Sequence, residues 1–238
     1  MGAKPPRCFF VHVMKTGGTT FHYQLMRVFA PNERYPFSRG EERRQQYTML
    51  DELRKLGPER REMLRMYCGH FPFLATSIVE PDVTMAILRN PIERTVSILR
   101  HFRRGSAEHR DTPLEALYEH PLIFPLFVRD YQTKMFAMLE ADDVESHRDP
   151  IDVDAERLRI AKENLERVDV VGLAHRHDQF VEQVGCRLGS RLGPAVNQRV
   201  STEGWDVSRS FRDRIAGDNP AEMEFYEYAL ALHERRRG

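Results

Sequence analysis

The chain has 238 residues, with 36 Lys and Arg against 36 Asp and Glu, and 41% of its residues are hydrophobic. This length suits one domain with a sizeable core, and the apolar content excludes a disordered chain. A net charge of zero argues against a general nucleic-acid binder, which needs a basic surface to neutralise phosphates. We therefore expect a single domain over residues 1–238 and no nucleic-acid partner.

Strand-like and helix-like patterns alternate along the chain. Short apolar runs predict buried strands at Arg7–Met14, Val83–Leu88 and Val168–Leu173. Amphipathic patterns and proline or glycine boundaries predict helices at Thr19–Ala30, Tyr47–Leu56, Pro58–Met66, Pro91–Arg103, 113–140, 154–167, 176–185, 207–217 and 220–236. The alternation predicts an α/β fold, with a central parallel sheet flanked by helices.

Two segments fall outside this alternation. Residues 32–46 are polar and irregular, and their sequence predicts no element. Residues 140–156 contain eight acidic residues and one basic residue, which is typical of a solvated loop.

Cysteine usage and hydropathy bear on the compartment. Cys8, Cys68 and Cys186 are odd in number and far apart, so neither a disulfide framework nor a zinc cluster is expected. The apolar runs are well under the roughly 18 residues that span a bilayer. The stretch Cys8–Met14 is interrupted by His12, and no small-residue cleavage site follows it, which argues against a signal peptide. We expect a soluble, cytoplasmic protein without a membrane anchor.

Ligands of parallel sheets bind beyond the carboxyl ends of the strands, which directs attention to residues 15–20, 89–97 and 172–178. The first of these segments joins a predicted strand to a predicted helix. Glycine lets the backbone approach a ligand, and the helix N-terminus adds amide donors and a positive dipole. The residues expected to hold a phosphate are Lys15, Thr16, Gly17, Gly18, Thr19 and Thr20. The alternative is a glycine-rich turn with a threonine capping the helix.

The second segment begins with Arg89, directly after the strand Val83–Leu88. The stripe formed by Ile92, Val96 and Leu99 is expected to face the sheet, which turns Ser97 toward a ligand near Arg89. An arginine fork and a serine hydroxyl suit a second phosphate. The alternative is an arginine paired with Glu93 and a serine on the surface.

Histidines supply the candidate base and a weak metal pattern. His70 stands in an otherwise apolar and aromatic stretch, and histidine is suited to proton transfer near neutral pH. The alternative is a core histidine with no catalytic role. His175, His177 and Asp178 are too few and too closely spaced to predict a metal site, so none is expected.

Taken together, these motifs resemble the sulfotransferases that use 3′-phosphoadenosine 5′-phosphosulfate (PAPS), most closely the carbohydrate branch related to heparan sulfate 2-O-sulfotransferase. Phe10–Phe21 is similar to the family's 5′-phosphosulfate loop, and Leu88–Ser97 resembles its 3′-phosphate motif. His70 stands where that branch keeps its presumed base. The chain departs from the family pattern with Met14 in place of a proline and Cys68 in place of a second histidine, and it has Asn90 in place of an aspartate.

The resemblance implies a P-loop-NTPase-like sulfotransferase fold, a PAPS donor that leaves as 3′-phosphoadenosine 5′-phosphate, and an acceptor that carries a hydroxyl group. His70 would be the general base and Lys15 would neutralise charge on the leaving group, while Arg89 and Ser97 would hold the 3′-phosphate. Asn197 and Arg199 lie where such enzymes close over the nucleotide, although a solvated loop is the alternative. The resemblance includes animal Golgi enzymes that carry a membrane anchor and a stem. Since neither is expected here, we expect a bacterial enzyme.

Two other classes of function stay open at this stage. A nucleotide kinase or NTPase shares the phosphate loop after the first strand, but the chain lacks the Walker spacing and an obvious acidic Mg²⁺ site. A non-catalytic module for nucleotides or anionic glycans would keep Lys15 and Arg89 without needing His70. The acceptor itself, whether sugar, lipid, phenol or peptide, is not indicated by any motif.

Overall fold

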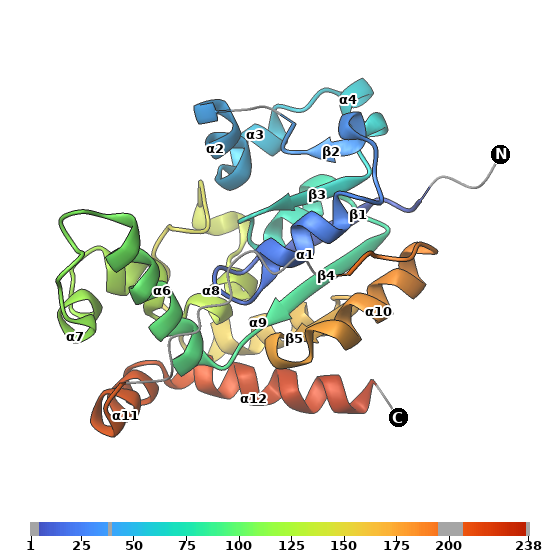
Figure 1. Ribbon diagram of the computed structural model, residues 1–238. Helices are drawn as coiled ribbons and strands as arrows, with labels where there is room; N and C mark the ends of the chain where they lie inside the picture. The colour runs from blue at the N-terminus through green and yellow to red at the C-terminus, as the bar shows by residue number, and fades with distance from the viewer. Residues whose placement is uncertain (1–4, 38–39, 195–206, 237–238) are drawn as a thin grey trace.

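The computed structural model of the chain describes residues 5–37, 40–194 and 207–236. Five strands form one sheet in the order β2-β3-β1-β4-β5 (Figure 1). These are β1 (Cys8–Val11), β2 (Arg34–Tyr35), β3 (Met66–Gly69), β4 (Val83–Leu88) and β5 (Val170–Leu173). All four pairings are parallel, so the predicted α/β fold with a parallel sheet flanked by helices is confirmed.

Helices occupy most of the connections between the strands. They are α1 (Gly18–Leu25), α2 (Gly40–Thr48), α3 (Leu50–Arg54), α4 (Pro58–Met63), α5 (Thr76–Val79), α6 (Pro91–Gly105), α7 (Leu114–Tyr118), α8 (Tyr131–Ala137), α9 (Ala155–Glu166), α10 (His177–Leu188), α11 (Arg209–Asp218) and α12 (Pro220–Arg235). The helical pattern over 113–140 is broken into α7, a π-helical turn η3 (Phe124–Val128) and α8. Pro121 and Pro125 lie in this region and have no N–H to continue a helix.

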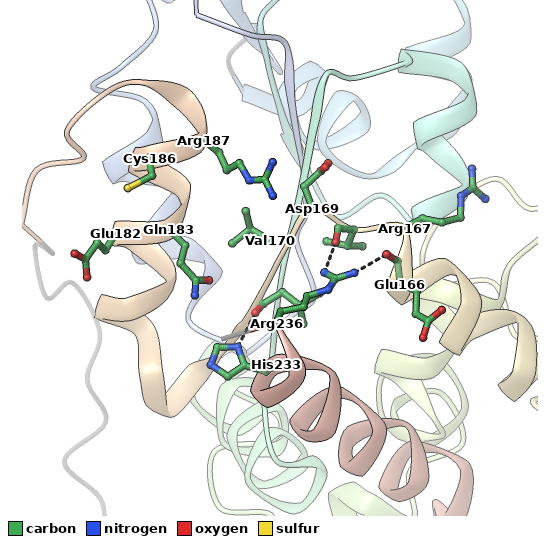
Figure 2. A pocket seen from close by; sticks show the side chains of 12 residues that line it. Glu166, Arg167, Asp169, Val170, Glu182, Gln183, Cys186, Arg187, His233 and Arg236 are labelled. Atoms are coloured by element: carbon green, nitrogen blue, oxygen red, sulfur yellow. Dashed lines mark hydrogen bonds between the residues drawn. The ribbon is translucent and has the colours of Figure 1, made fainter. Parts of the chain in front are cut away.

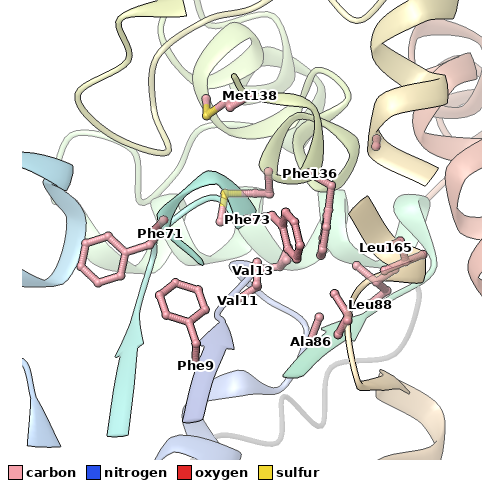
Figure 3. Close-up of a cluster of buried hydrophobic side chains, with 14 of the residues drawn as sticks. Phe9, Val11, Val13, Phe71, Phe73, Ala86, Leu88, Phe136, Met138 and Leu165 are labelled. Atoms are coloured by element: carbon pink, nitrogen blue, oxygen red, sulfur yellow. The ribbon is translucent and has the colours of Figure 1, made fainter. Parts of the chain in front are cut away.

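Two layers of helices cover the sheet because side chains alternate along each strand. Phe10 of β1 packs with Phe21 of α1 and Phe180 of α10 on one face. Phe9 and Val11 point to the other face, where Figure 3 shows them among buried aromatic and aliphatic side chains. Helices α8, α9 and α12 supply the covering residues on that second side. Both faces of β1 are therefore buried, as its uninterrupted apolar sequence predicts.

The strand β3 was not expected from the sequence. Its first residue, Met66, ends the predicted helix Pro58–Met66, whereas α4 stops at Met63. Val11 of β1 pairs with Gly69 of β3 and with Ala86 of β4. This register brings the residues that follow β1, β3 and β4 to one edge of the sheet.

The prediction that α6 faces the sheet through Ile92, Val96 and Leu99 is wrong. Val96 and Leu99 lie in a separate cluster with residues of α7 and α11, and Ile92 packs against the same cluster. No strand residue belongs to this cluster within the described residues. The apolar stripe of α6 is therefore buried, but it packs against α7 and α11 and not against the sheet (Figure 1).

Two further properties concern the chain as a whole. None of the helices that the structure describes is long and apolar enough to cross a bilayer. Cys8, Cys68 and Cys186 are all free thiols, of which Cys8 and Cys68 are buried.

Candidate active site

The loop after β1 turns sharply before α1. Lys15 and Gly17 have positive φ values of 68° and 93°, so the chain passes twice through the left-handed region. Gly17 is the N-cap of α1, and within the described residues it carries no side-chain cap. The first amides of a helix have no partner inside the helix. An uncapped helix start behind a lysine is suited to an anion.

Some donors of this loop are already used inside the protein. The Thr16 side chain is buried, and its hydroxyl donates to the Val13 carbonyl over 3.0 Å. The Thr20 N–H donates to the Gly17 carbonyl over 3.1 Å. Thr16 therefore stabilises the loop from the protein interior, whereas Thr19 is exposed to solvent.

Gly18 is required by a neighbouring histidine. A Cβ atom at this position would lie 2.3 Å from Cδ2 of His12, closer than any real contact. The imidazole of His12 stacks on Phe10, with ring centroids 5.2 Å apart, and is almost fully buried. The loop Lys15–Thr20 therefore packs directly against the His12 ring.

Arg89 reaches the same loop from β4. Its Nη1–H donates to the Lys15 carbonyl over 3.2 Å, as expected if the two strands are neighbours. Its Nε–H also donates to Glu93 over 3.2 Å, which is the pairing that the alternative interpretation of this motif named. Ser97 is half-buried on α6. The structure thus joins Arg89 to the first loop and also to Glu93.

His70 follows β3 and lies beside β1. Its Nδ1 is 2.7 Å from the His12 carbonyl, and because a carbonyl can only accept, Nδ1 carries the proton. Burial lowers the pKa of His70 from 6.5 to about 4, so the ring is neutral at pH 7. A neutral ring protonated at Nδ1 has its lone pair on Nε2, which is the state that a general base requires.

Two more histidines surround His70, and neither was selected from the sequence. The ring centroids of His12 and His147 lie 4.4 Å and 5.3 Å from that of His70. Burial is the main cause that lowers the pKa of each well below its usual value, and repulsion between the protonated form of each ring and that of His70 lowers it further. His12 is visible in sequence as a polar residue closing a buried strand. His147 carries no such signal, because it stands in the acidic segment 140–156.

Tyrosine hydroxyls hold these two outer histidines. Tyr47 lies 2.8 Å from Nδ1 of His12, and Tyr131 lies 2.7 Å from Nδ1 of His147. Nε2 of His147 is buried and has no hydrogen-bond partner in the described part of the chain. The expectation of a solvated loop over residues 140–156 is therefore wrong around His147, because Tyr131 of α8 draws this residue into the core.

A thiol and a fourth histidine extend the cluster. Nδ1 of His22 lies 2.9 Å from Sγ of Cys68, the residue on β3 that precedes Gly69. Burial raises the pKa of the Cys68 thiol and lowers that of His22 to about 4, so both are neutral near pH 7. Cys68 is therefore a buried, uncharged hydrogen-bond partner of His22. We refer to His12, His22, His70 and His147 as the histidine cluster.

The remaining residues singled out from the sequence are Asn197, Arg199 and the histidines near residue 176. Asn197 and Arg199 lie outside the residues that the structure describes. His177 contacts Gln24 over 3.1 Å, and it lies near Gly17. Over residues 5–37, 40–194 and 207–236, no three His, Cys, Asp or Glu side chains are arranged to hold a metal ion.

A pocket of about 750 Å³ lies beside β5, away from the loops described above, and is lined by residues of α9, α10, α12 and the segment that leads into β5 (Figure 2). His233 and Arg236 line it, but their side chains donate to the carbonyls of Val171 and Val168. The pocket contains none of the residues predicted to bind a ligand. It borders the residues that enter β5, whereas the loops described above follow the strand ends.

Comparisons with known proteins add no identification. No protein-family model matches the chain, and no curated protein matches it.

Proposed function

We propose that the chain is a PAPS-dependent sulfotransferase with a P-loop-NTPase-like sulfotransferase fold, and that it transfers the sulfuryl group to an acceptor hydroxyl. The observation that carries the proposal is the meeting of three strand ends. Lys15, His70 and Arg89 follow the neighbouring strands β1, β3 and β4, and Arg89 contacts the Lys15 carbonyl. A loop suited to a phosphate, a second cation and a neutral histidine at one edge of the sheet support the proposal.

The nucleotide would lie across the first two loops. The amides of Gly18 and Thr19 at the start of α1 would hold the 5′-phosphate, together with the hydroxyls of Thr19 and Thr20. Arg89 would hold the 3′-phosphate, with Ser97 as the second donor. A guanidinium presents five N–H groups, so Arg89 can contact a phosphate while it also contacts the Lys15 loop. PAPS supplies the sulfuryl group that is transferred.

The protein's own groups account for proton and charge movement. Nε2 of His70 would accept the proton from the acceptor hydroxyl, because Nδ1–H is held by the His12 carbonyl. The Lys15 ammonium would stabilise negative charge on the leaving phosphate oxygen, as fixed cations do in phosphoryl transfer. Burial, and to a smaller extent the charges of Arg148 and Lys15, lower the pKa of His70, which keeps its Nε2 lone pair unprotonated at neutral pH.

The test is a thermal-shift titration with 3′-phosphoadenosine 5′-phosphate, compared with ADP and ATP in the presence and absence of Mg²⁺. Ligand at 100 times its dissociation constant adds roughly 2.7 kcal/mol of stability, which raises the unfolding midpoint measurably. We expect selective stabilisation by the 3′-phosphorylated nucleotide without Mg²⁺. Stabilisation only by ATP with Mg²⁺ would overturn the proposal in favour of a kinase or NTPase.

Binding alone does not separate an enzyme from a regulatory module. The second measurement is release of 3′-phosphoadenosine 5′-phosphate from PAPS in the presence of hydroxyl-bearing acceptors. Sugars, phenols, lipids and hydroxyl-bearing peptides form the acceptor panel. Tight nucleotide binding without turnover on any acceptor would favour the non-catalytic module.

A further inference from the structure

Arg89 is held at its backbone by one buried side chain. The Arg89 N–H donates to Oε1 of Gln132 over 2.9 Å, and Nε2 of Gln132 donates to the Arg89 carbonyl over 2.8 Å. The last register pair between β4 and β5 joins Leu88 to Leu173, one residue earlier. Gln132 therefore takes the place of a strand partner for the first residue beyond the sheet.

The amide orientation of Gln132 is determined by its surroundings. Nε2 also donates to Oε1 of Glu222 over 3.1 Å, and the Gln132 N–H donates to Oε2 of Glu222 over 3.0 Å. A flipped amide would place its NH₂ group against the Arg89 N–H and its oxygen against two acceptors. Gln132 can thus make this set of contacts in one orientation only.

Glu222 is fixed in turn by Arg94. The Arg94 Nε–H donates to Oε1 of Glu222 over 3.1 Å, and both side chains are at most 1% exposed. The remaining Arg94 nitrogens donate to the carbonyls of Phe127 and Val128. We refer to Arg94, Gln132 and Glu222 as the ion-pair network. Since its members are buried and paired, the position of the Arg89 peptide cannot drift without breaking several contacts.

From this arrangement we propose that Gln132 is a positioning residue for the 3′-phosphate: its side chain holds the Arg89 peptide so that the guanidinium meets the Lys15 loop. The inference rests on the proposed function, because it assigns Arg89 to the 3′-phosphate. Gln132 itself contacts no nucleotide in this proposal. It determines where the Arg89 side chain starts and therefore how far apart the two phosphate-binding loops lie.

The experiment compares the affinities for 3′-phosphoadenosine 5′-phosphate and for adenosine 5′-phosphate, which lacks the 3′-phosphate. Gln132→Met keeps the length of the side chain and removes all its hydrogen bonds. We expect the ratio of the two affinities to fall about tenfold, equivalent to the loss of one strong contact to the 3′-phosphate. Affinity for adenosine 5′-phosphate should stay unchanged.

A double-mutant cycle separates positioning from general support of the fold. In an Arg89→Ala background, Gln132→Met should leave the affinity ratio unchanged, because the group that it positions is gone. Thr84→Val is the matched control, since Thr84 is buried at the other end of β4 and its hydroxyl donates to Asp169 over 2.7 Å. Thr84→Val should lower the unfolding midpoint and keep the affinity ratio.

A second variant covers the case in which Gln132→Met does not fold. The exchange Gln132→Glu with Glu222→Gln keeps the charge of the ion-pair network and leaves an acceptor for the Arg89 N–H. It replaces the donor to the Arg89 carbonyl with an oxygen, and the single amide oxygen of residue 222 can no longer accept from both Arg94 and the residue 132 N–H. We expect the affinity ratio to fall by about threefold or more.

The outcomes distinguish the two proposals. A wild-type protein that binds both nucleotides equally would overturn the proposed function, and the inference with it. A selective wild type whose Gln132 variants keep the full affinity ratio would overturn the positioning role alone.

Discussion

Two buried polar groups, the ion-pair network and the histidine cluster, differ in how their members are paired. The ion-pair network carries full charges, and each charged group in it has a partner of opposite charge. The histidine cluster consists of rings whose low pKa values keep them neutral, and it leaves Nε2 of His147 without a partner in the described chain. Pairing suits a part that must hold its position, whereas neutral rings suit a part that must accept a proton.

The largest effect that this contrast predicts is on catalysis. His70→Ala should lower turnover of PAPS by on the order of 10²–10⁴, because the acceptor hydroxyl loses the base assigned to it. Affinity for 3′-phosphoadenosine 5′-phosphate should stay nearly unchanged, since His70 is not assigned to the nucleotide. Initial rates and a binding titration measure the two quantities. His175→Ala, at an exposed position, is the control. Unchanged turnover in His70→Ala would remove it from the mechanism.

The ion-pair network should show its main effect in stability. Arg94→Ala leaves Glu222 buried without its cation, and removing one partner of a buried pair costs about 3–5 kcal/mol of unfolding free energy. Urea denaturation measures this loss. The control is Arg159→Ala, whose exposed ion pairs with Glu156 and Glu163 should contribute less than about 1 kcal/mol. Similar losses in the two variants would contradict the contrast drawn between buried and exposed pairs.

The histidine cluster should make the fold sensitive to acid. Above pH 6.5 the histidines are largely neutral in both states. Below pH 6.5 the unfolded chain binds protons that His22 and His70 in the folded chain do not bind until about pH 4, and the pKa values of His12 and His147 are also well below their usual value. The free energy of unfolding should therefore fall as the pH is lowered from 6.5 to 4. Urea midpoints across this range measure the slope. His147→Asn should reduce the slope, and the exposed His175→Asn should leave it as in the wild type.

The smallest expected effect concerns the ion pair between Glu93 and Arg89, the residue whose peptide the ion-pair network holds. Glu93 contacts Arg89 over 3.2 Å and is partly exposed, so it competes with a phosphate for the same guanidinium. Glu93→Gln should tighten binding of 3′-phosphoadenosine 5′-phosphate by about two- to fivefold, in keeping with the modest strength of exposed ion pairs. Isothermal titration at low salt measures the change. Weaker binding in this variant would mean that Glu93 orients Arg89 instead of competing for it.

Local chemistry explains why part of this molecule was predictable. The strands β1, β4 and β5 are short apolar runs bounded by turn residues, and the loop Lys15–Thr20 contains in its own sequence the glycines, threonines and lysine from which phosphate binding was predicted. Both features depend on residues that are adjacent in the chain. The parallel arrangement followed from the alternation of strands with helices.

The features that were not predicted depend on partners far away in the chain. The short β3 is a strand because it pairs with β1, and its sequence has no period of its own. The stripe of α6 was recognised, but periodicity cannot say whether a stripe meets a sheet or other helices. His147 is buried through Tyr131, and Gln132 has its role through Arg89 and Glu222. Such contacts belong to the tertiary structure.

The dependence of Arg89 on Glu222 has a consequence for synthesis of the protein. The loops that follow β1 and β4 are made early, but Glu222 belongs to α12, the last helix that the structure describes. Until α12 has left the ribosome and docked, Arg94 has no carboxylate to pair with, and the Gln132 amide is held from one side only. A nascent chain should therefore fix the Arg89 peptide in its final position only after α12 has been made and has docked.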